Sequence, residues 1–244
     1  MRVGVYVDGY NLYYGGRRQC GRSTAGWRWL DVRGLAEALV AERRNWVGAT
    51  VDRLVYCTAR VDAATNPSAH ADQDVYLKAL VATSSVDWIE YGNYVARTRR
   101  SLLAVEDPKT RKPKVVTSHW PVMIQDSAGS DVPDARFMVN TLHLEEKGSD
   151  VNVASHLLID VLNGTVDAAV VVSNDSDLAL PVRTVRNHVP LGLVNPSGGY
   201  FAGDLVGKPG DGVGRHWGKK LESSDYYAHQ LADPAGGLTK PSGW

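Results

Sequence analysis

Cysteine is scarce in this chain, which carries only Cys20 and Cys57 among its 244 residues. Two cysteines so far apart fit neither a disulfide framework nor the paired spacing of a zinc site. Apolar runs long enough to cross a membrane are missing as well. These two absences exclude a disulfide-stapled secreted domain and an integral membrane protein, and they favour a reduced, globular chain.

An excess of charge of either sign is also missing, since 27 lysines and arginines balance 27 aspartates and glutamates. The balance argues against a protein coated by nucleic acid and leaves local basic patches open. Gly15-Gly16 lacks the spacing and the Lys-Ser/Thr of a phosphate loop, and no Gly-x-Gly-x-x-Gly follows the first strand. Met1-Arg2 leads directly into a strand-like run, which predicts no signal peptide and a cytoplasmic location.

Strand-like and helix-like segments alternate along most of the chain. Apolar or alternating runs predict five strands, at 2–7, 51–57, 86–91, 167–173 and 189–194. Helical spacing and capping residues predict helices at 31–44, from Asn66-Pro67 onward, at 150–162 and at 178–187. This rhythm is typical of an α/β fold, in which helices cover a parallel sheet.

The segment 94–137 interrupts this rhythm with short β-like pieces rich in arginine, lysine and threonine. We therefore predict a domain over 1–195 with an inserted, basic, β-rich excursion at about 94–137. The remainder, 196–244, is rich in glycine, proline and serine and is predicted to be a partly irregular C-terminal extension. Its last dozen residues have the composition of a disordered tail.

Carboxylates follow two of the predicted strands at once. Asp8 comes directly after the first strand, Asp175 and Asp177 come after the fourth, and Asp150 opens a helix. If the sheet reverses its order between the first and fourth strands, these acids meet at the switch point where open α/β sheets bind ligands. Clustered carboxylates need a cation, and Mg²⁺ with its bound water suits phosphodiester chemistry.

Each acid also has a purely structural interpretation. Asp150 and Asp177 begin helices, where a carboxylate caps free N–H groups. Asp175 and Asp8 lie in tight turns, where aspartate commonly makes local hydrogen bonds. Taken together, the acids favour a site in which Asp175 is the firmer ligand and Asp177 divides its role with helix capping.

Several motifs in one order give the chain a family resemblance. They are Val7-Asp8-Gly9-Tyr10-Asn11-Leu12, Tyr56-Cys57-Thr58-Ala59-Arg60, Gln73 with Tyr76-Leu77 and Leu80, Glu146-Lys147-Gly148-Ser149-Asp150-Val151, and Val172-Ser173-Asn174-Asp175-Ser176-Asp177-Leu178. With these motifs the chain resembles the NYN domains of the PIN-like nuclease superfamily, close to the bacterial LabA-like branch. The resemblance covers roughly residues 1–195. Leu178 departs from it, because the family often has an aromatic residue there.

The resemblance implies a three-layer, PIN-like, Rossmannoid parallel sheet in the order 3-2-1-4-5. It also implies a ribonuclease that hydrolyses RNA phosphodiesters with Mg²⁺ or Mn²⁺, and we expect this enzyme to be an endonuclease. The metal ligands would be Asp8, Asp150, Asp175 and Asp177. Asn11 would join them as a catalytic residue that helps hold the metal or the scissile phosphate.

Residues that would contact the RNA lie in and around these motifs. We expect them to be Lys147, Ser173, Asn174, Arg17, Arg18, Arg99 and Arg100. The arginines belong to two basic runs, one in the predicted loop after the first strand and one in the 94–137 excursion. Tyr91, Tyr94 and Trp120 could stack on bases, as could Tyr13 or Tyr14, although packing under the first helix is an alternative for the last two.

Two other functions remain open on the sequence alone. One is a non-catalytic, RNA-binding or regulatory module on the same fold, and the other is a phosphohydrolase of small phosphate esters. A homo-oligomer or a regulatory protein partner is equally compatible with the residues.

Overall fold

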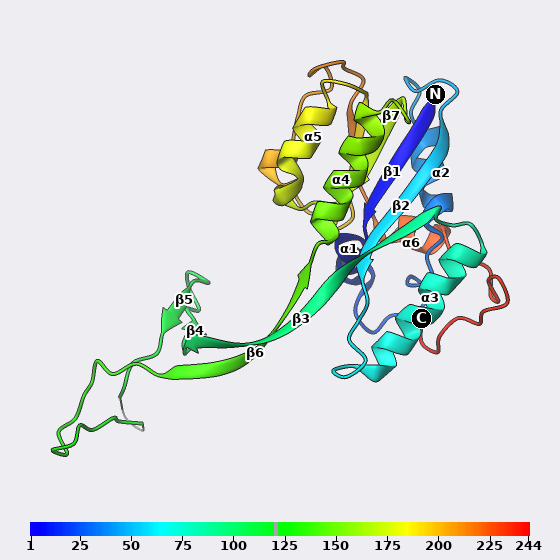
Figure 1. Ribbon diagram of the computed structural model, residues 1–244. Helices are drawn as coiled ribbons and strands as arrows, with labels where there is room; N and C mark the ends of the chain where they lie inside the picture. The colour runs from blue at the N-terminus through cyan, green and yellow to red at the C-terminus, as the bar shows by residue number, and fades with distance from the viewer. Residues whose placement is uncertain (120–121) are drawn as a thin grey trace. The chain divides into compact units, whose positions relative to one another are not determined.

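A central sheet of mostly parallel strands is flanked by helices in this mixed α/β protein (Figure 1). The computed structural model describes residues 1–119 and 122–244. The elements are β1 (Arg2–Asp8), α1 (Gly9–Cys20), α2 (Val32–Ala41), β2 (Thr50–Ala59), α3 (Pro67–Ala82), β3 (Trp88–Leu102), β4 (Ala104–Glu106), β5 (Pro113–Val115), β6 (Met138–Lys147), α4 (Ser149–Leu162), β7 (Ala168–Val172), the 3-10 helix η1 (Ser176–Leu178), α5 (Ala179–Val185), β8 (Leu191–Asn195), the 3-10 helix η2 (Gly203–Leu205), β9 (Trp217–Lys220) and α6 (Ser223–Ala228).

The strands of the sheet follow the order β6-β3-β2-β1-β7-β8-β9. β1 lies between β2 and β7 and is parallel to both, with Val7 opposite Tyr56 on one side and Val172 on the other. The chain therefore leaves β1 toward β2 and β3 first and returns later to the other side with β7 and β8. The carboxyl ends of β1 and β7 form the point at which this order reverses, as the sequence predicts for the acids.

Alternation along β1 divides the core between the two faces of the sheet. Val3, Val5 and Val7 belong to a buried cluster with residues of α2 and α3, whereas Tyr6 belongs to a second cluster with residues of α4 and α5. Successive side chains of a strand point to opposite faces, so helices on both faces follow from this pattern. The predicted mixed α/β class, with a mostly parallel sheet covered by helices, is confirmed.

A buried ionic network fastens α4 to two strands of the sheet. Asp160 of α4 accepts hydrogen bonds from Arg53 Nε of β2 at 2.5 Å and from the Tyr6 hydroxyl of β1 at 3.0 Å. Tyr6 and Asp160 are buried and Arg53 is partly exposed, so the contacts satisfy the two buried polar groups, which would be costly to leave unpaired. This network fixes how α4, which begins at the acidic residues, docks on the sheet.

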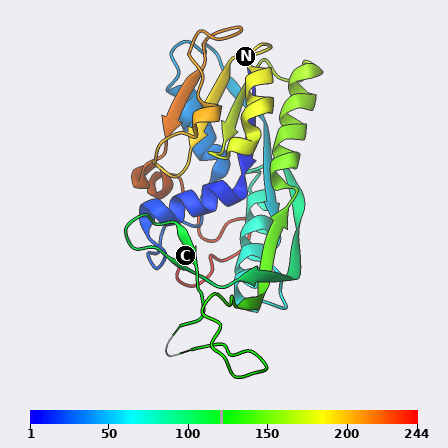
Figure 2. The ribbon, with the colours of Figure 1, turned by 90° about the vertical axis from the view of Figure 1, so that its left-hand side faces the viewer.

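Helix α1 was not expected, because the sequence reading leaves residues 9–20 as a loop. Its buried face consists of Gly9, Leu12, Gly15 and Gly16. Two adjacent glycines weaken a helix, so no helical pattern is visible in the sequence. Arg17 and Arg18, predicted in a loop, lie in the last turn of α1, and Figure 2 shows this helix (blue) crossing the lower end of the sheet in that view.

The last dozen residues are packed, so the prediction of a disordered tail is wrong. Ala235 is buried, and the Trp244 ring lies 5.6 Å from Tyr76 and 6.4 Å from Trp29, measured between ring centroids. Residues 146–244 form one compact unit with residues 1–94, and residues 95–145 form a second unit. Within the described part of the chain, no helix has the length and apolar character that a membrane span requires.

Candidate functional site

Asp8 stands at the centre of a hydrogen-bonded group at the carboxyl ends of β1 and β7. Its carboxylate accepts hydrogen bonds from the Asn11 backbone N–H at 2.9 Å, from Asn11 Nδ2 at 2.7 Å and from Ser173 Oγ at 2.9 Å. Asp8 is buried and also caps the N-terminus of α1. The structure therefore brings Asp8, Asn11 and Ser173 together, as the sequence predicts.

The segment after β7 continues the same network. Asn174 donates its backbone N–H to Asn11 Oδ1 at 3.3 Å, and Asp175 donates its N–H to Ser173 Oγ at 3.1 Å. The Asn174 side chain bonds to two backbone groups of the segment after β8, the Tyr200 carbonyl and the Ala202 N–H. Asn174 therefore joins β7 to that segment, a structural role beside the substrate contact predicted for it.

Helix capping is distributed differently from the sequence prediction. Asp175, not Asp177, caps the 3-10 helix η1, because its carboxylate accepts the Asp177 N–H at 3.0 Å. Asp150 lies in the first turn of α4 but makes no capping bond, and the N-cap position belongs to Gly148 with φ of 100°. Neither Asp150 nor Asp177 is the N-cap residue of its helix, but both carboxylates lie in the first helical turn, where the helix dipole favours a negative charge.

Five carboxylates act on one another electrostatically at this place. Burial is the main cause that raises the pKa of Asp150 to about 7, and the charges of Asp8, Asp175, Glu146 and Asp177 raise it further. Burial likewise raises the pKa of Asp8, and the charge of Asp175 adds to this against three hydrogen bonds that oppose it. We call Asp8, Glu146, Asp150, Asp175 and Asp177 the acidic cluster.

The acidic cluster also influences neutral neighbours on β2. The pKa of the buried Cys57 thiol is raised to about 12, first by burial and then by the charges of Asp8, Glu90 and Asp150. A thiol with so high a pKa stays protonated and is a poor nucleophile. The chemistry of the site therefore lies with its carboxylates, and Asp150 titrates near neutral pH.

The other predicted contact residues divide between the two compact units. Lys147 ends β6 beside Glu146, and Arg17 and Arg18 lie on α1, all within the unit that carries the acidic cluster. Arg99 and Arg100 are exposed on β3 within the second unit. The base-stacking role predicted for Trp120 lies outside the described residues.

Metal ligands in the usual arrangement are not found at the acidic cluster. Within residues 1–119 and 122–244, no three or more His, Cys, Asp or Glu side chains form a group that could hold a metal ion. Metal ligation by Asp8, Asp150, Asp175 and Asp177 therefore stays a prediction. Mg²⁺ often uses only one or two carboxylates and keeps several waters, so cation binding itself stays a prediction.

Titration with Mg²⁺ and Mn²⁺ tests this prediction. A bound cation favours ionised carboxylates, so each ion is expected to lower the pKa of Asp150 from about 7 and to raise the melting temperature above that pH. Carbon-13 chemical shifts of the Asp150 carboxyl report its pKa directly. An unchanged pKa at millimolar Mg²⁺, together with no selective broadening of the Asp150 signal by Mn²⁺, would contradict cation binding at the cluster.

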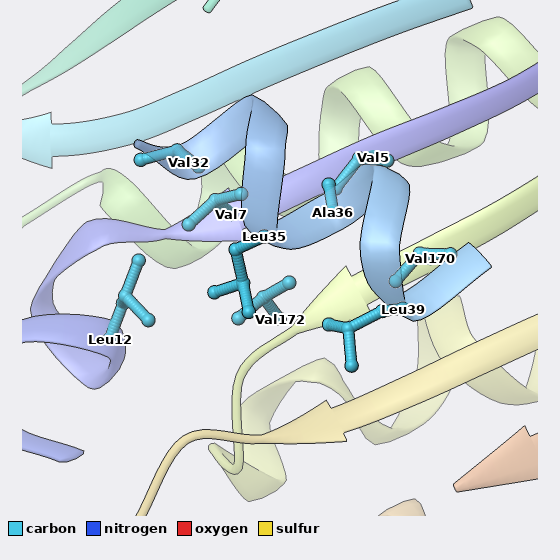
Figure 3. A pocket seen from close by; sticks show the side chains of 9 residues that line it. All are labelled: Val5, Val7, Leu12, Val32, Leu35, Ala36, Leu39, Val170 and Val172. Atoms are coloured by element: carbon cyan, nitrogen blue, oxygen red, sulfur yellow. The ribbon is translucent and has the colours of Figure 1, made fainter. Parts of the chain in front are cut away.

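A small cavity lies elsewhere, in the core between α2 and the sheet (Figure 3). Its volume is about 10 Å³, and aliphatic side chains alone line it. The lining residues are Val5, Val7, Leu12, Val32, Leu35, Ala36, Leu39, Val170 and Val172. A space so small and apolar stays dry and offers a ligand no polar contact, so it is a packing gap and not a binding site.

Comparison with known proteins changes the expected chemistry. No family model matches the chain. Over an alignment of 268 positions the chain is 29% identical to 6-hydroxy-3-succinoylpyridine 3-monooxygenase HspA of Pseudomonas putida (strain DSM 28022 / S16), covering 100% of this chain and 75% of that protein. A protein of unknown function from Vibrio parahaemolyticus RIMD 2210633, VPA0982, is similar in structure with a TM-score of 0.41 and 13% identity, over 89% of this chain and 91% of that chain.

The full-length similarity to a monooxygenase overturns the predicted activity. It points to an oxidoreductase, so the prediction of a Mg²⁺- or Mn²⁺-dependent ribonuclease that hydrolyses RNA phosphodiesters is wrong. The phosphohydrolase and the RNA-binding module, which were the alternatives, are not supported by this relative either. An acidic cluster at a sheet switch point is compatible with several chemistries. Phosphodiester hydrolysis, the one predicted from the sequence, is not the one that this relative indicates.

Proposed function

We propose that this protein is an oxidoreductase of the monooxygenase class that acts on a hydroxylated nitrogen heteroaromatic compound. The observation that carries the proposal is the 29% identity to HspA, which extends over the whole of this chain. The similarity includes the segments that hold the acidic cluster, so the proposal assigns the reaction to this cluster.

Asp150 is the proton-transfer group in this proposal. With its pKa raised to about 7, it can accept a proton near neutral pH and return it, as a general base and acid must. In 6-hydroxy-3-succinoylpyridine, the compound that appears in the name of HspA, ring position 3 lies para to the hydroxyl group at position 6. Removal of the hydroxyl proton by Asp150 enriches this carbon in electrons and prepares it for attack by an electrophilic oxygen species. Because the same carbon carries the succinoyl group, the new C–O bond forms as the ring–acyl bond breaks. The bonding electrons return to the ring, and the acyl group is taken up by water as the carboxylic acid, or leaves as the aldehyde if a second reduced nicotinamide supplies two more electrons.

The reaction class fixes the electron balance. One atom of dioxygen enters the ring product, and the other leaves as water after it takes up two electrons from a reduced nicotinamide or flavin and two protons from that donor and the solvent. Organic cofactors or metals normally carry the activation of dioxygen. Asp8-Gly9-Tyr10-Asn11 after β1 lacks the glycines of a dinucleotide site, and the described residues hold no metal-ligand group. The residues described above are assigned substrate binding and proton transfer, and a bound cofactor would supply the activation of dioxygen.

We also propose that the scaffold is PIN-like and that the chain is a relative of NYN domains that serves a different reaction. The neighbouring strands β3-β2-β1-β7-β8 and the Asp8–Asn11–Ser173 network support this proposal. A common scaffold does not dictate a common reaction, because function depends on the groups at the site. A divalent cation, a cytoplasmic location and a homo-oligomer or regulatory partner stay predictions.

Oxygen uptake tests the proposed function. We expect the purified protein to consume dioxygen in the presence of 6-hydroxy-3-succinoylpyridine, reduced nicotinamide and free flavin, with uptake that depends on all components. Heat-denatured protein serves as the control for uncoupled flavin oxidation. Uptake no faster than in this control, for the pyridine and for its ring-hydroxylated analogues alike, would contradict the function.

A further inference from the structure

Four tyrosine rings form a continuous patch at the start of α1. Tyr10 lies 5.4 Å from Tyr14 and 6.0 Å from Tyr94 of β3, and Tyr13 lies 5.3 Å from Tyr14, all between ring centroids. Tyr13 is 41% exposed and Tyr14 is 50% exposed. We call Tyr10, Tyr13, Tyr14 and Tyr94 the tyrosine patch.

Packing of α1 accounts for only one of these rings, since Tyr13 lies 5.6 Å from the buried Trp27 between ring centroids. The helix buries its opposite face, which consists of Gly9, Leu12, Gly15 and Gly16, against the rest of the protein. The tyrosines occupy the outer face of α1, where polar side chains would serve the stability of the helix equally well. Exposed aromatic side chains that cluster on one face commonly mark a binding surface.

One end of the tyrosine patch adjoins the acidic cluster. Tyr10 directly precedes Asn11, whose side chain holds the Asp8 carboxylate at 2.7 Å. At the same end, the pKa of Tyr94 is raised to about 12, first by burial and then by the charge of Glu146. Tyr94 of the patch therefore lies within the electrostatic reach of Glu146 in the acidic cluster.

The other end of the patch is basic. The Arg17 guanidinium lies 5.7 Å from the centroid of the Tyr14 ring, and Arg18 is exposed beside it in the last turn of α1. An arginine at a helix C-terminus interacts favourably with the helix dipole. Its planar guanidinium group can also bind a carboxylate through two parallel hydrogen bonds. The tyrosine patch therefore has the acidic cluster near one end and the guanidinium groups of Arg17 and Arg18 at the other.

We propose that the tyrosine patch stacks on the planar ring of the substrate while Arg17 and Arg18 hold a carboxylate on its side chain. The inference rests on the proposed function and specifies its ligand: a hydroxylated heteroaromatic ring with an anionic tail. The ring stacks on Tyr14, and the tail extends along α1 toward the arginines.

Calorimetric titration without reductant measures this binding apart from turnover. The probes are 6-hydroxy-3-succinoylpyridine, its non-planar counterpart 4-cyclohexyl-4-oxobutanoate, and 2-hydroxypyridine, which lacks the tail. We expect Tyr14→Leu to weaken binding of the first probe about tenfold, because the loss of an aromatic stacking partner typically has this size. Tyr91→Leu is the matched control, since Tyr91 is 40% exposed and has Arg60 at 4.9 Å from its ring centroid.

The three probes separate the ring from the tail. The cyclohexyl compound should bind the parent protein about tenfold more weakly than the pyridine. Arg17→Gln should weaken binding of the pyridine with the tail and leave that of 2-hydroxypyridine unchanged. An unchanged dissociation constant in Tyr14→Leu, an equal loss in Tyr91→Leu, or no binding to the parent protein would overturn the inference.

The outcome for binding is independent of the outcome for activity. Binding with the expected variant pattern but without oxygen uptake would contradict the proposed function and leave the tyrosine patch as a ligand site. If the protein consumed dioxygen but Tyr14→Leu bound the pyridine as tightly as the parent, the proposed function would be supported. The substrate ring would then bind at a place other than the tyrosine patch.

Discussion

Asp150→Asn is expected to lower the rate of substrate oxygenation by about 100-fold, the usual contribution of a general base. In the parent protein the rate should rise as the pH passes through about 7, because the ionised carboxylate accepts the substrate proton. The variant should lose this rise. Steady-state oxygen uptake between pH 5 and pH 9 measures both effects.

The same substitution should stabilise the protein at alkaline pH. Because the pKa of Asp150 is raised on folding, its favourable contribution is complete below about pH 4 and is lost as the pH rises through about 7. Asparagine carries no charge, so the melting temperature of Asp150→Asn should exceed that of the parent near pH 8 and approach it near pH 5. Activity and stability would then change in opposite directions, which excludes misfolding as the cause.

Asp134→Asn is the control for this pair of measurements, since Asp134 is an exposed aspartate of the second compact unit. It should alter neither the rate nor the pH dependence of melting. If Asp150→Asn retained the parent rate and pH profile, Asp150 would not be the proton-transfer group.

Gly15→Ala is expected to destabilise the protein by about 2 kcal/mol, the usual size of an overpacking cost. A Cβ at this position would lie 2.5 Å from the carbonyl oxygen of Pro196, a backbone atom that cannot move aside by changing rotamer. Alanine favours helix over glycine by roughly 1 kcal/mol, so propensity alone predicts the opposite sign. Urea unfolding measures the difference in the free energy of unfolding.

Gly203→Ala provides the matched control, because a Cβ there meets no atom within 4 Å. It should leave the unfolding free energy unchanged or slightly raised. A Gly15→Ala protein as stable as the parent would show that α1 is not held against Pro196, and the neighbouring Asp8–Asn11 geometry would lose its support.

The arrangement around Asp8 could be predicted because it depends on the ends of strands. Short apolar runs followed by Asp8 and by Ser173-Asn174-Asp175 locate two strand ends, and neighbouring parallel strands bring these ends together. The hydrogen bond from Ser173 Oγ to Asp8 is the direct result. The capping bond was assigned to Asp177 and is made by Asp175, because the two residues are only two positions apart and a 3-10 helix begins between them.

Helix α1 and the C-terminal packing could not be predicted for a different reason. Gly15 and Gly16 are buried because they have no side chain, so close packing replaces the apolar periodicity that marks a helix. Ala235 and Trp244 are too widely spaced to form a pattern, and only the fold brings Trp244 onto Tyr76. The reaction was also beyond prediction, since carboxylates at a strand end serve metal binding and proton transfer equally well.

Oxygen-18 labelling is the most direct test of the proposed monooxygenase activity. In an atmosphere of ¹⁸O₂, with 6-hydroxy-3-succinoylpyridine and a reduced nicotinamide or flavin as electron donor, mass spectrometry should find one labelled oxygen atom in each molecule of the ring product. Asp150→Asn should slow the appearance of this product about 100-fold. A product labelled only from H₂¹⁸O, or no labelled product at all, would contradict the assignment of this protein to the monooxygenases.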